Sequence, residues 1–240
     1  MKLDRKTIEN DMEYLRQIST PIDFENDNYL EYIKKLREYC ATHYCYAMAP
    51  VQIGIPKRLI YVKNTQQSMD NNVTKGYDEG IIYINPTIVD AKGQTRFLEG
   101  CESCMYRENG ENIHLTAIVD RPYSLVIEYY DINGNKKTKT IEGFEATIFS
   151  HEYDHLNGIL HMDRSSKIFK MTIEEMRAYR NEHPYYILTK DSQYISRIKT
   201  NKTKKIYWFR IYLFIKLHTT LHTKKIKSRV VSSILKCLKL

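Results

Sequence analysis

The stretch "SHEYDHLNG", residues 150–158, decides how the rest of this sequence is interpreted. His151 and His155 are four positions apart, so on a helix both side chains project from one face. Phe144 and Ile148 fall on the same stripe, and a stripe that combines apolar and imidazole side chains is expected to form a pocket wall. We therefore predict a helix that runs from Phe144 to the end of this stretch and carries two metal ligands.

Glu152 directly follows the first histidine. From there its carboxylate can reach a metal-bound water without binding the metal itself. The pattern His-Glu-x-x-His thus supplies two ligands and a general base, as in metal-dependent hydrolases. The alternative is a surface helix with two incidental histidines, and the apolar residues on the same face disfavour it.

A catalytic metal site of this kind needs a third protein ligand and an open coordination position. The segment "LEGCESC" offers Cys101 and Cys104. If both bound, the four ligands would close the site, but 46 residues separate Cys104 from His151. Zinc-finger modules use gaps of roughly 12–15 residues. We therefore predict that Cys101, His151 and His155 hold one divalent metal ion and that Cys104 is a small buried residue.

Taken together, these residues resemble the peptide deformylase family, which has three motifs in a fixed order. The third, Q-H-E-x-D-H-L-x-G, stands here as "SHEYDHLNG", and the second, E-G-C-L-S, as "EGCES" with Glu102 in place of leucine. The first, G-x-G-L-A-A-x-Q, stands as "CYAMAPVQ", which keeps Gln52 but has Cys45 and Ala47 where the family has glycines. The resemblance covers about residues 12–165.

The resemblance implies a fold, a reaction and a cofactor. The fold would be α+β, with antiparallel or mixed sheets packed around the central helix that bears His-Glu-x-x-His. The enzyme would remove the N-formyl group from the initiator N-formylmethionine of nascent polypeptides and release formate. Its metal would be Fe(II), which Zn(II) or Ni(II) can replace, with one ion per chain.

The resemblance also assigns roles around the metal. Glu152 would carry the proton of the attacking water, while the Gln52 side chain and the backbone N–H of Glu102 would hydrogen-bond the formyl oxygen. Such donors stabilise the oxyanion that forms when water adds to an amide. Phe144 and Ile148 would line an apolar slot for the methionine side chain, or else belong only to the core.

Three further residues affect the site that the resemblance implies. Ala47 is an expected substrate-binding residue. It adds a Cβ atom where the family has glycine, and we expect this atom to narrow the peptide groove. Glu102 places a carboxylate beside a metal ligand, where it would repel substrate or point to solvent. Arg121 is expected to form an ion pair with Glu99, and this pair would support the segment that carries Cys101. The substitutions at positions 47 and 102 indicate a divergent member of the family.

The rest of the body predicts an α+β order, with a helix, then several strands, then the ligand-bearing helix. Asn-Gly within residues 131–137 is typical of a hairpin turn, and the polar residues 64–80 are typical of an exposed loop. The predicted helix covers residues 26–44, and the predicted strands cover residues 55–63, 81–91, 95–103, 124–131 and 137–143.

The charge of +8 on the 240 residues hides two different parts. Residues 195–240 hold 13 of the 37 basic residues and no acidic one, so residues 1–194 carry 24 basic against 29 acidic side chains, a net charge of −5. We predict a catalytic domain over 1–194 and a basic extension over 195–240. The extension fits a basic amphipathic segment on a membrane surface or on ribosomal RNA, or a poorly ordered segment without a selected role.

No apolar run reaches the roughly 18 residues of a membrane span, and the start of the chain lacks the apolar core of a signal peptide. We therefore expect a cytoplasmic monomer with reduced cysteines. Two other functions stay open. One is a zinc peptidase, whose signature is also His-Glu-x-x-His. The other is a catalytically weak, deformylase-like protein retained for binding.

Overall fold

The computed structural model describes residues 3–43, 45–63, 80–165 and 167–196. The expected exposed loop at residues 64–79 and nearly all of the expected basic extension therefore lie outside the described residues. In the described part, α2 (Tyr29–His43) and α4 (Gly143–His155) confirm the two predicted helices.

One nine-stranded sheet forms the body, and every strand pair in it is antiparallel. Its main path runs in the order β1-β2-β3-β5-β4, while β6 and β9 pair with β3, β7 pairs with β6 and β8 pairs with β5. The strands are β1 (Ala47–Met48), β2 (Leu59–Val62), β3 (Ile81–Glu99), β4 (Met105–Glu108), β5 (Glu111–Arg121), β6 (Ser124–Tyr130), β7 (Lys136–Glu142), β8 (Ile168–Met171) and β9 (Tyr186–Gln193).

Short helical elements complete the chain. Two further α-helices are α1 (Met12–Leu15), which precedes the first strand, and α5 (Ile173–Glu182), which lies between β8 and β9 in the sequence. Three 3₁₀ helices connect longer elements: η1 (Pro50–Ile53), η2 (Glu102–Cys104) and η3 (His161–Arg164). The α+β prediction is confirmed.

The long strand β3 corrects the prediction of two separate strands over residues 81–91 and 95–103. It continues through Gly93, whose φ of +68° and close backbone neighbours leave no space for a Cβ atom. It ends at Glu99, and η2 begins at Glu102, so residues 101–103 are not part of a strand. Because β3 pairs with β2 and β6 near its start and with β5 and β9 near its end, it links both halves of the sheet.

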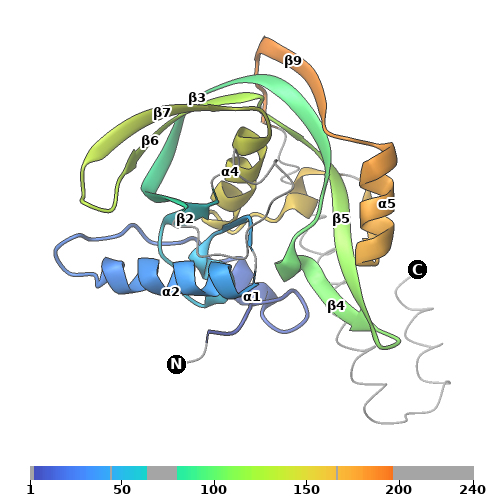
Figure 1. Cartoon of the computed structure of the whole chain (residues 1–240), viewed down its shortest axis with the longest axis horizontal. Coiled ribbons are helices and arrows are strands. Elements are labelled where there is room, and N and C mark those ends of the chain that lie inside the picture. Colours follow the sequence, from blue (N-terminus) through green and yellow to red (C-terminus); the bar gives the residue numbers. More distant parts are fainter. Residues whose placement is uncertain (1–2, 44, 64–79, 166, 197–240) are drawn as a thin grey trace.

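Helix α4 lies at the centre of the molecule, with β6 and β7 on one side and β5 on the other (Figure 1). Its Ala146 and Phe149 are fully buried and pack in one cluster with Tyr83, Leu125 and other residues of the strands. Burial of a large apolar side chain such as Phe149 or Leu125 stabilises the fold by about 1.5–3 kcal/mol. The helix that carries the two histidines is therefore held rigidly inside the sheet.

The end of α4 is set by a close approach of two chain segments. Gly158 has a φ of +65°, and a Cβ atom there would lie 2.3 Å from the carbonyl oxygen of Arg16. Only glycine fits this position without moving the backbone. The prediction that Gly158 stops the helix is thus confirmed, although the last residue of regular helix is His155, three positions earlier.

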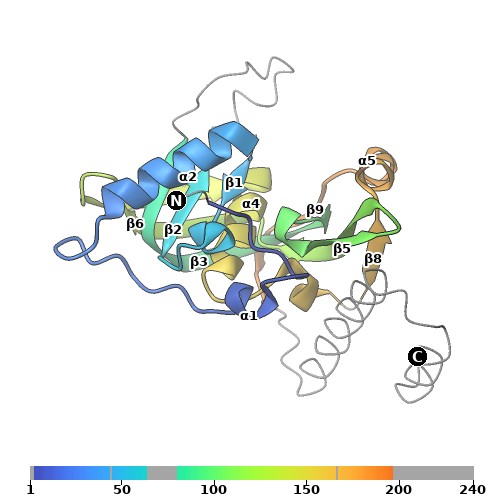
Figure 2. The ribbon, with the colours of Figure 1, turned by 90° about the horizontal axis from the view of Figure 1, so that it is seen from below.

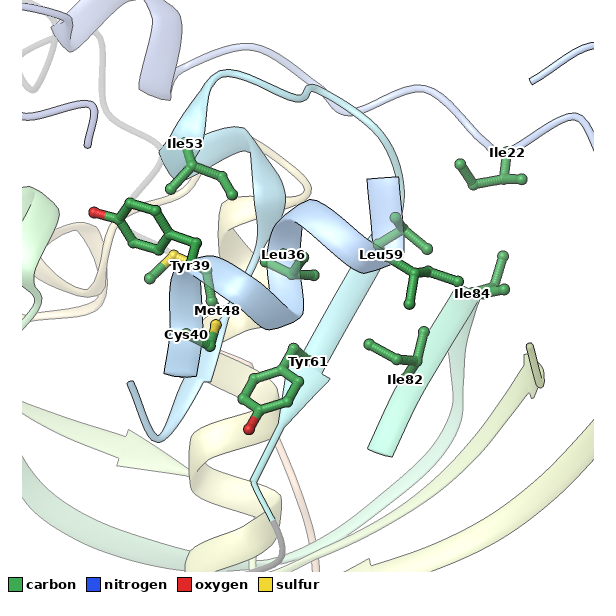
Figure 3. Close-up of a cluster of buried hydrophobic side chains, with 11 residues drawn as sticks. Ile22, Leu36, Tyr39, Cys40, Met48, Ile53, Leu59, Tyr61, Ile82 and Ile84 are labelled. Carbon is green, nitrogen blue, oxygen red and sulfur yellow. The ribbon is translucent and has the colours of Figure 1, made fainter. Parts of the chain in front are cut away.

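A second cluster packs α2 against the sheet (Figure 3). Leu36 and Cys40 of α2 belong to this cluster together with Leu59 of β2 and Ile84 of β3, and all four are buried. Seen from below, α2 runs across β1 and β2 (Figure 2). Met48 of β1 and Ile53 of η1 belong to the same cluster, so the packing of α2 also holds the first motif in place.

Candidate active site

Three side chains with metal-binding atoms meet between the end of β3 and α4. Sγ of Cys101 and one ring nitrogen each of His151 and His155 all lie within 4.8 Å of one another. Sγ of Cys101 is 3.4 Å from Nε2 of His155. The structure thus brings together the three residues that the sequence spacing selects, and one thiolate with two imidazoles is a donor set that suits a divalent transition metal.

Cys104 lies outside this group. Its side chain is fully buried in a core cluster with Ile8 and Leu15, and no four-residue metal-ligand group occurs in the part of the chain that the structure describes. Burial raises the pKa of the Cys104 thiol well above its usual value. That thiol and the neighbouring His155 both lower the pKa of Cys101, which favours a thiolate at Cys101 only.

Glu99 orients the first histidine. Its Oε2 lies 2.8 Å from Nδ1 of His151, which leaves Nε2 of that ring for a metal. Arg121 holds the same carboxylate with two hydrogen bonds of 2.7 and 2.8 Å, so the predicted Arg121–Glu99 pair is confirmed. Burial opposes ionisation of Glu99, but Arg121 and His151 outweigh it and keep the pKa of Glu99 below its usual range.

The buried network continues beyond Arg121. Its guanidinium also donates to Asp154, and Arg164 donates to the same carboxylate from the other side. Charges therefore alternate from Glu99 to Arg164. Asp154 is therefore linked to the metal-binding residues through Arg121 and Glu99, and the sequence analysis did not identify Arg164 as a member of this network.

Glu152 lies in the same buried region as the metal-binding atoms. Its Oε2 accepts a hydrogen bond of 2.8 Å from the backbone N–H of Ala49. The side chain is 6% exposed, and burial raises the pKa of this carboxyl above its usual value. A carboxylate with a raised pKa is better matched to proton transfer near neutral pH. Nothing in the sequence marks Ala49 as its partner, because a backbone N–H has no residue signature.

Gln52 is buried on η1 and turned toward the metal-binding cysteine. Its Nε2 donates to Oγ of Ser103 at 3.1 Å and lies 3.4 Å from Sγ of Cys101, while its Oε1 accepts from the N–H of Ala49 at 3.1 Å. These contacts fix the amide with its N–H group on the metal side. Ser103 is a further partner that the sequence analysis did not identify.

Glu102 begins η2, directly after Cys101. Its backbone N–H is at the first position of a helical turn, where such groups lack an intrahelical partner and are free to bind an anion or oxyanion. Its carboxylate turns outward, with 53% of the side chain exposed, and pairs with Arg5. The expectation that this carboxylate points to solvent is therefore met in part.

The three expected substrate-binding residues lie in different surroundings. Ala47 and Ile148 are partly buried and pack against the same core cluster, which also contains Ala49, the residue whose N–H donates to Glu152. Phe144 contacts the rings of Phe97 and Tyr185, each with centroids 5.4 Å away. Phe144 is likewise partly buried and belongs to this aromatic group and not to that cluster, so all three residues stay candidates for the substrate groove.

A buried histidine that was not predicted lies beside the metal cluster. The ring of His161 stacks on that of His151, with centroids 5.6 Å apart, and its Nε2 lies 3.0 Å from the carbonyl oxygen of Leu115. Burial lowers the pKa of His161 to about 4, so its ring is neutral near pH 7. We take it as a support that packs His151 in place.

Comparison with known proteins agrees with this geometry. The family model of polypeptide deformylases matches residues 5–171, which include all three motifs. This chain belongs to the polypeptide deformylase family. It is therefore an enzyme whose family depends on a metal ion, as the sequence predicts.

Individual polypeptide deformylases show how far the similarity extends. A peptide deformylase of Rhizobium meliloti (strain 1021) is 31% identical over 157 residues, which cover 64% of this chain and 80% of that protein. The crystal structure of Plasmodium falciparum peptide deformylase matches with a TM-score of 0.55 at 27% identity, covering 75% of this chain and 94% of that one. The Synechococcus elongatus enzyme in complex with actinonin gives a TM-score of 0.55 at 25% identity, covering 75% and 87%.

The expectation about membrane spans was tested on the helices. Among the residues that the structure describes, no helix is both long and apolar enough to cross a bilayer.

Proposed function

We propose that this enzyme removes the N-formyl group from the N-formylmethionine at the start of nascent polypeptides and releases formate. The observation that supports this most strongly is the meeting of Cys101, His151 and His155 next to the buried Glu152. One thiolate and two imidazoles would hold one divalent ion and leave a coordination position open. We further propose Fe(II) in the cell, with Zn(II) or Ni(II) as substitutes.

The bound metal would supply a Lewis acid that polarises the formyl carbonyl and makes water a stronger nucleophile. Glu152 would take the proton of the attacking water on its carboxylate and pass it to the leaving amine. The hydrogen bond from Ala49 and the buried surroundings hold this carboxylate in one orientation. The leaving group departs as a free amino terminus, and the acyl part departs as formate.

Two donors would stabilise the oxyanion that develops on the formyl oxygen. The amide N–H of Gln52 already faces Cys101, and the backbone N–H of Glu102 follows Cys101 in the chain. Loss of one such donor typically costs about 2.7–4 kcal/mol of transition-state stabilisation. Ala47 and Ile148 would border the groove for the methionine side chain.

Further proposals concern the whole chain. Residues 1–194 would form the catalytic domain of a cytoplasmic monomer, and the basic residues 195–240 would contact ribosomal RNA. The acidic body and the basic extension carry charges of opposite sign, which supports separate partners for the two parts.

The reaction is tested by its products. Protein loaded with Fe(II) or Ni(II) and kept without oxygen is incubated with a short formyl-methionyl peptide. We expect formate and free methionyl amine in equal amounts. Cleavage inside the peptide would instead indicate a peptidase, and the absence of any product would indicate a binding protein.

A further inference from the structure

The N-terminal arm, residues 5–8, joins the two segments that carry the proposed oxyanion donors. The backbone N–H of Lys6 donates to the carbonyl oxygen of Gln52 at 2.8 Å, and that of Ile8 donates to the carbonyl oxygen of Ser103 at 2.8 Å. Lys6 thus joins the arm to the first motif, and Ile8 joins it to the second. A side chain of the arm is therefore well placed to act on both.

Arg5 is the side chain that does so. Its Nη1 lies 2.5 Å from Oε2 of Glu102, its Nε donates to the hydroxyl of Tyr39 at 3.1 Å, and its Nη2 lies 3.9 Å from Sγ of Cys45. The guanidinium also lies over the ring of Tyr39, 5.7 Å from its centroid. With 18% of its side chain exposed, Arg5 is held by the protein, whereas the Glu102 side chain is 53% exposed.

A charge at Glu102 matters because the backbone N–H of the same residue is a proposed oxyanion donor. In the proposed reaction this N–H hydrogen-bonds the formyl oxygen, which becomes negative as water adds to the carbon. The carboxylate belongs to the same residue and adds to the negative charge of the Cys101 thiolate next to it. If it were unpaired, it would oppose the developing oxyanion, and the effect would be greatest where the site excludes water.

We propose that Arg5 is a positioning residue for deformylation, which neutralises the Glu102 carboxylate and holds it away from the reacting carbonyl. The inference rests on the proposed function, because it takes the Glu102 N–H as an oxyanion donor. Arg5 acts through Glu102 and does not touch the substrate.

Stability does not account for this pair. Ion pairs with solvent access contribute little to folding, because water screens the charges and the long side chains lose rotational freedom. The chain also has a second ion pair of the same kind on the arm, between Lys6 and Asp11, with 28% and 27% of the side chains exposed. Lys6→Ala is therefore a matched control that removes a cation from the arm without changing Glu102.

The test is a double-mutant cycle on the full-length enzyme loaded with Ni(II), with a short formyl-methionyl peptide as substrate. Arg5→Ala should lower kcat/KM roughly three- to thirtyfold, as expected for one unpaired charge near an oxyanion. In a Glu102→Gln background, the same change should alter kcat/KM by less than about twofold, because no carboxylate is left to neutralise. The loss in Arg5→Ala should also shrink as salt is raised, because an exposed carboxylate is screened.

Metal content and the unfolding midpoint are measured on every variant, and Lys6→Ala should match the parent in kcat/KM. The proposal is overturned if Arg5→Ala matches the parent, if its loss is equally large in the Glu102→Gln background, or if salt leaves the loss unchanged. If the parent enzyme itself releases no formate, the proposed function fails instead, so the two failures are distinguishable.

Discussion

At the scale of single residues, Cys101 and Cys104 differ in what surrounds their sulfur atoms. Cys101 faces two imidazoles, whereas Cys104 is fully buried among apolar side chains. We expect Cys101→Ala to lose bound metal, because two imidazoles alone leave the ion too few ligands. Cys104→Ala should keep one metal per chain. The measurement is metal content per folded chain, and equal loss in both variants would favour a closed four-ligand site.

Glu152 gives the second prediction at this scale. Glu152→Gln keeps a side chain of the same shape that can still accept the Ala49 hydrogen bond, but it cannot carry a proton. We expect full metal content with a loss of turnover of about 10²–10⁴-fold. Metal content and formate release are measured on one preparation. Near-parental turnover at full metal occupancy would rule out Glu152 as the general base.

The sequence predicted that Cys101, His151 and His155 come together, but it could not predict which backbone groups contact the site. His151 and His155 follow from the helical period, which places residues four apart on one face. Cys101 follows from the strength of a thiolate as a metal ligand. The N–H of Ala49 is supplied by a backbone position, so any residue except proline could stand there. Ser103 and Arg5 escaped notice because they reach the site through folding of distant segments.

At the scale of elements, the buried charges between β3, β5 and α4 form one connected unit. Arg121 is 1% exposed and binds both Glu99 and Asp154. Arg121→Met should destabilise the fold by about 3–5 kcal/mol, because two carboxylates then lose a buried partner. It should also weaken metal binding, since Glu99 no longer holds His151 firmly.

Chemical unfolding and a metal-competition titration measure the two effects in this variant. Asp154→Asn is the matched comparison, because it removes one charge of the network but leaves the Arg121–Glu99 pair intact. If both variants bind metal as tightly as the parent, the network supports the fold and not the site.

The elements that the sequence predicted share a clear signal, and among the others β5 and β9 lack one. Helix α2 and the hairpin of β6 and β7 follow apolar periodicity and an Asn-Gly turn. Strand β5 has a run of buried residues from His114 to Ala117, so it lacks the alternation of a half-exposed strand, and β9 is exposed throughout. Helix α5 did have a signal, the capping box of Thr172 and Glu175, which the sequence analysis overlooked.

At the scale of the whole molecule, the described body ends close to the buried charge network. Tyr194 donates to the carbonyl oxygen of Asp120, and Oγ of Ser196 accepts from Arg164 at 3.1 Å. Truncation after Ser196 keeps both contacts and removes most of the basic extension. We expect such an enzyme to keep its turnover of a short peptide.

The same truncation should abolish salt-sensitive binding to ribosomes, because phosphate contacts by Lys and Arg weaken as salt rises. Co-sedimentation with ribosomes at several salt concentrations measures this. Binding that persists in the truncated enzyme would show that the extension is not the contact.

The central claim is that one metal ion, held by Cys101, His151 and His155, makes this chain a deformylase. It is tested most directly by removing the metal with a chelator without oxygen and adding Ni(II) back in steps. We predict that formate release disappears on removal and returns in proportion to bound metal, reaching its maximum at one ion per chain. Full formate release from metal-free enzyme, or a maximum that requires two ions per chain, would contradict the account.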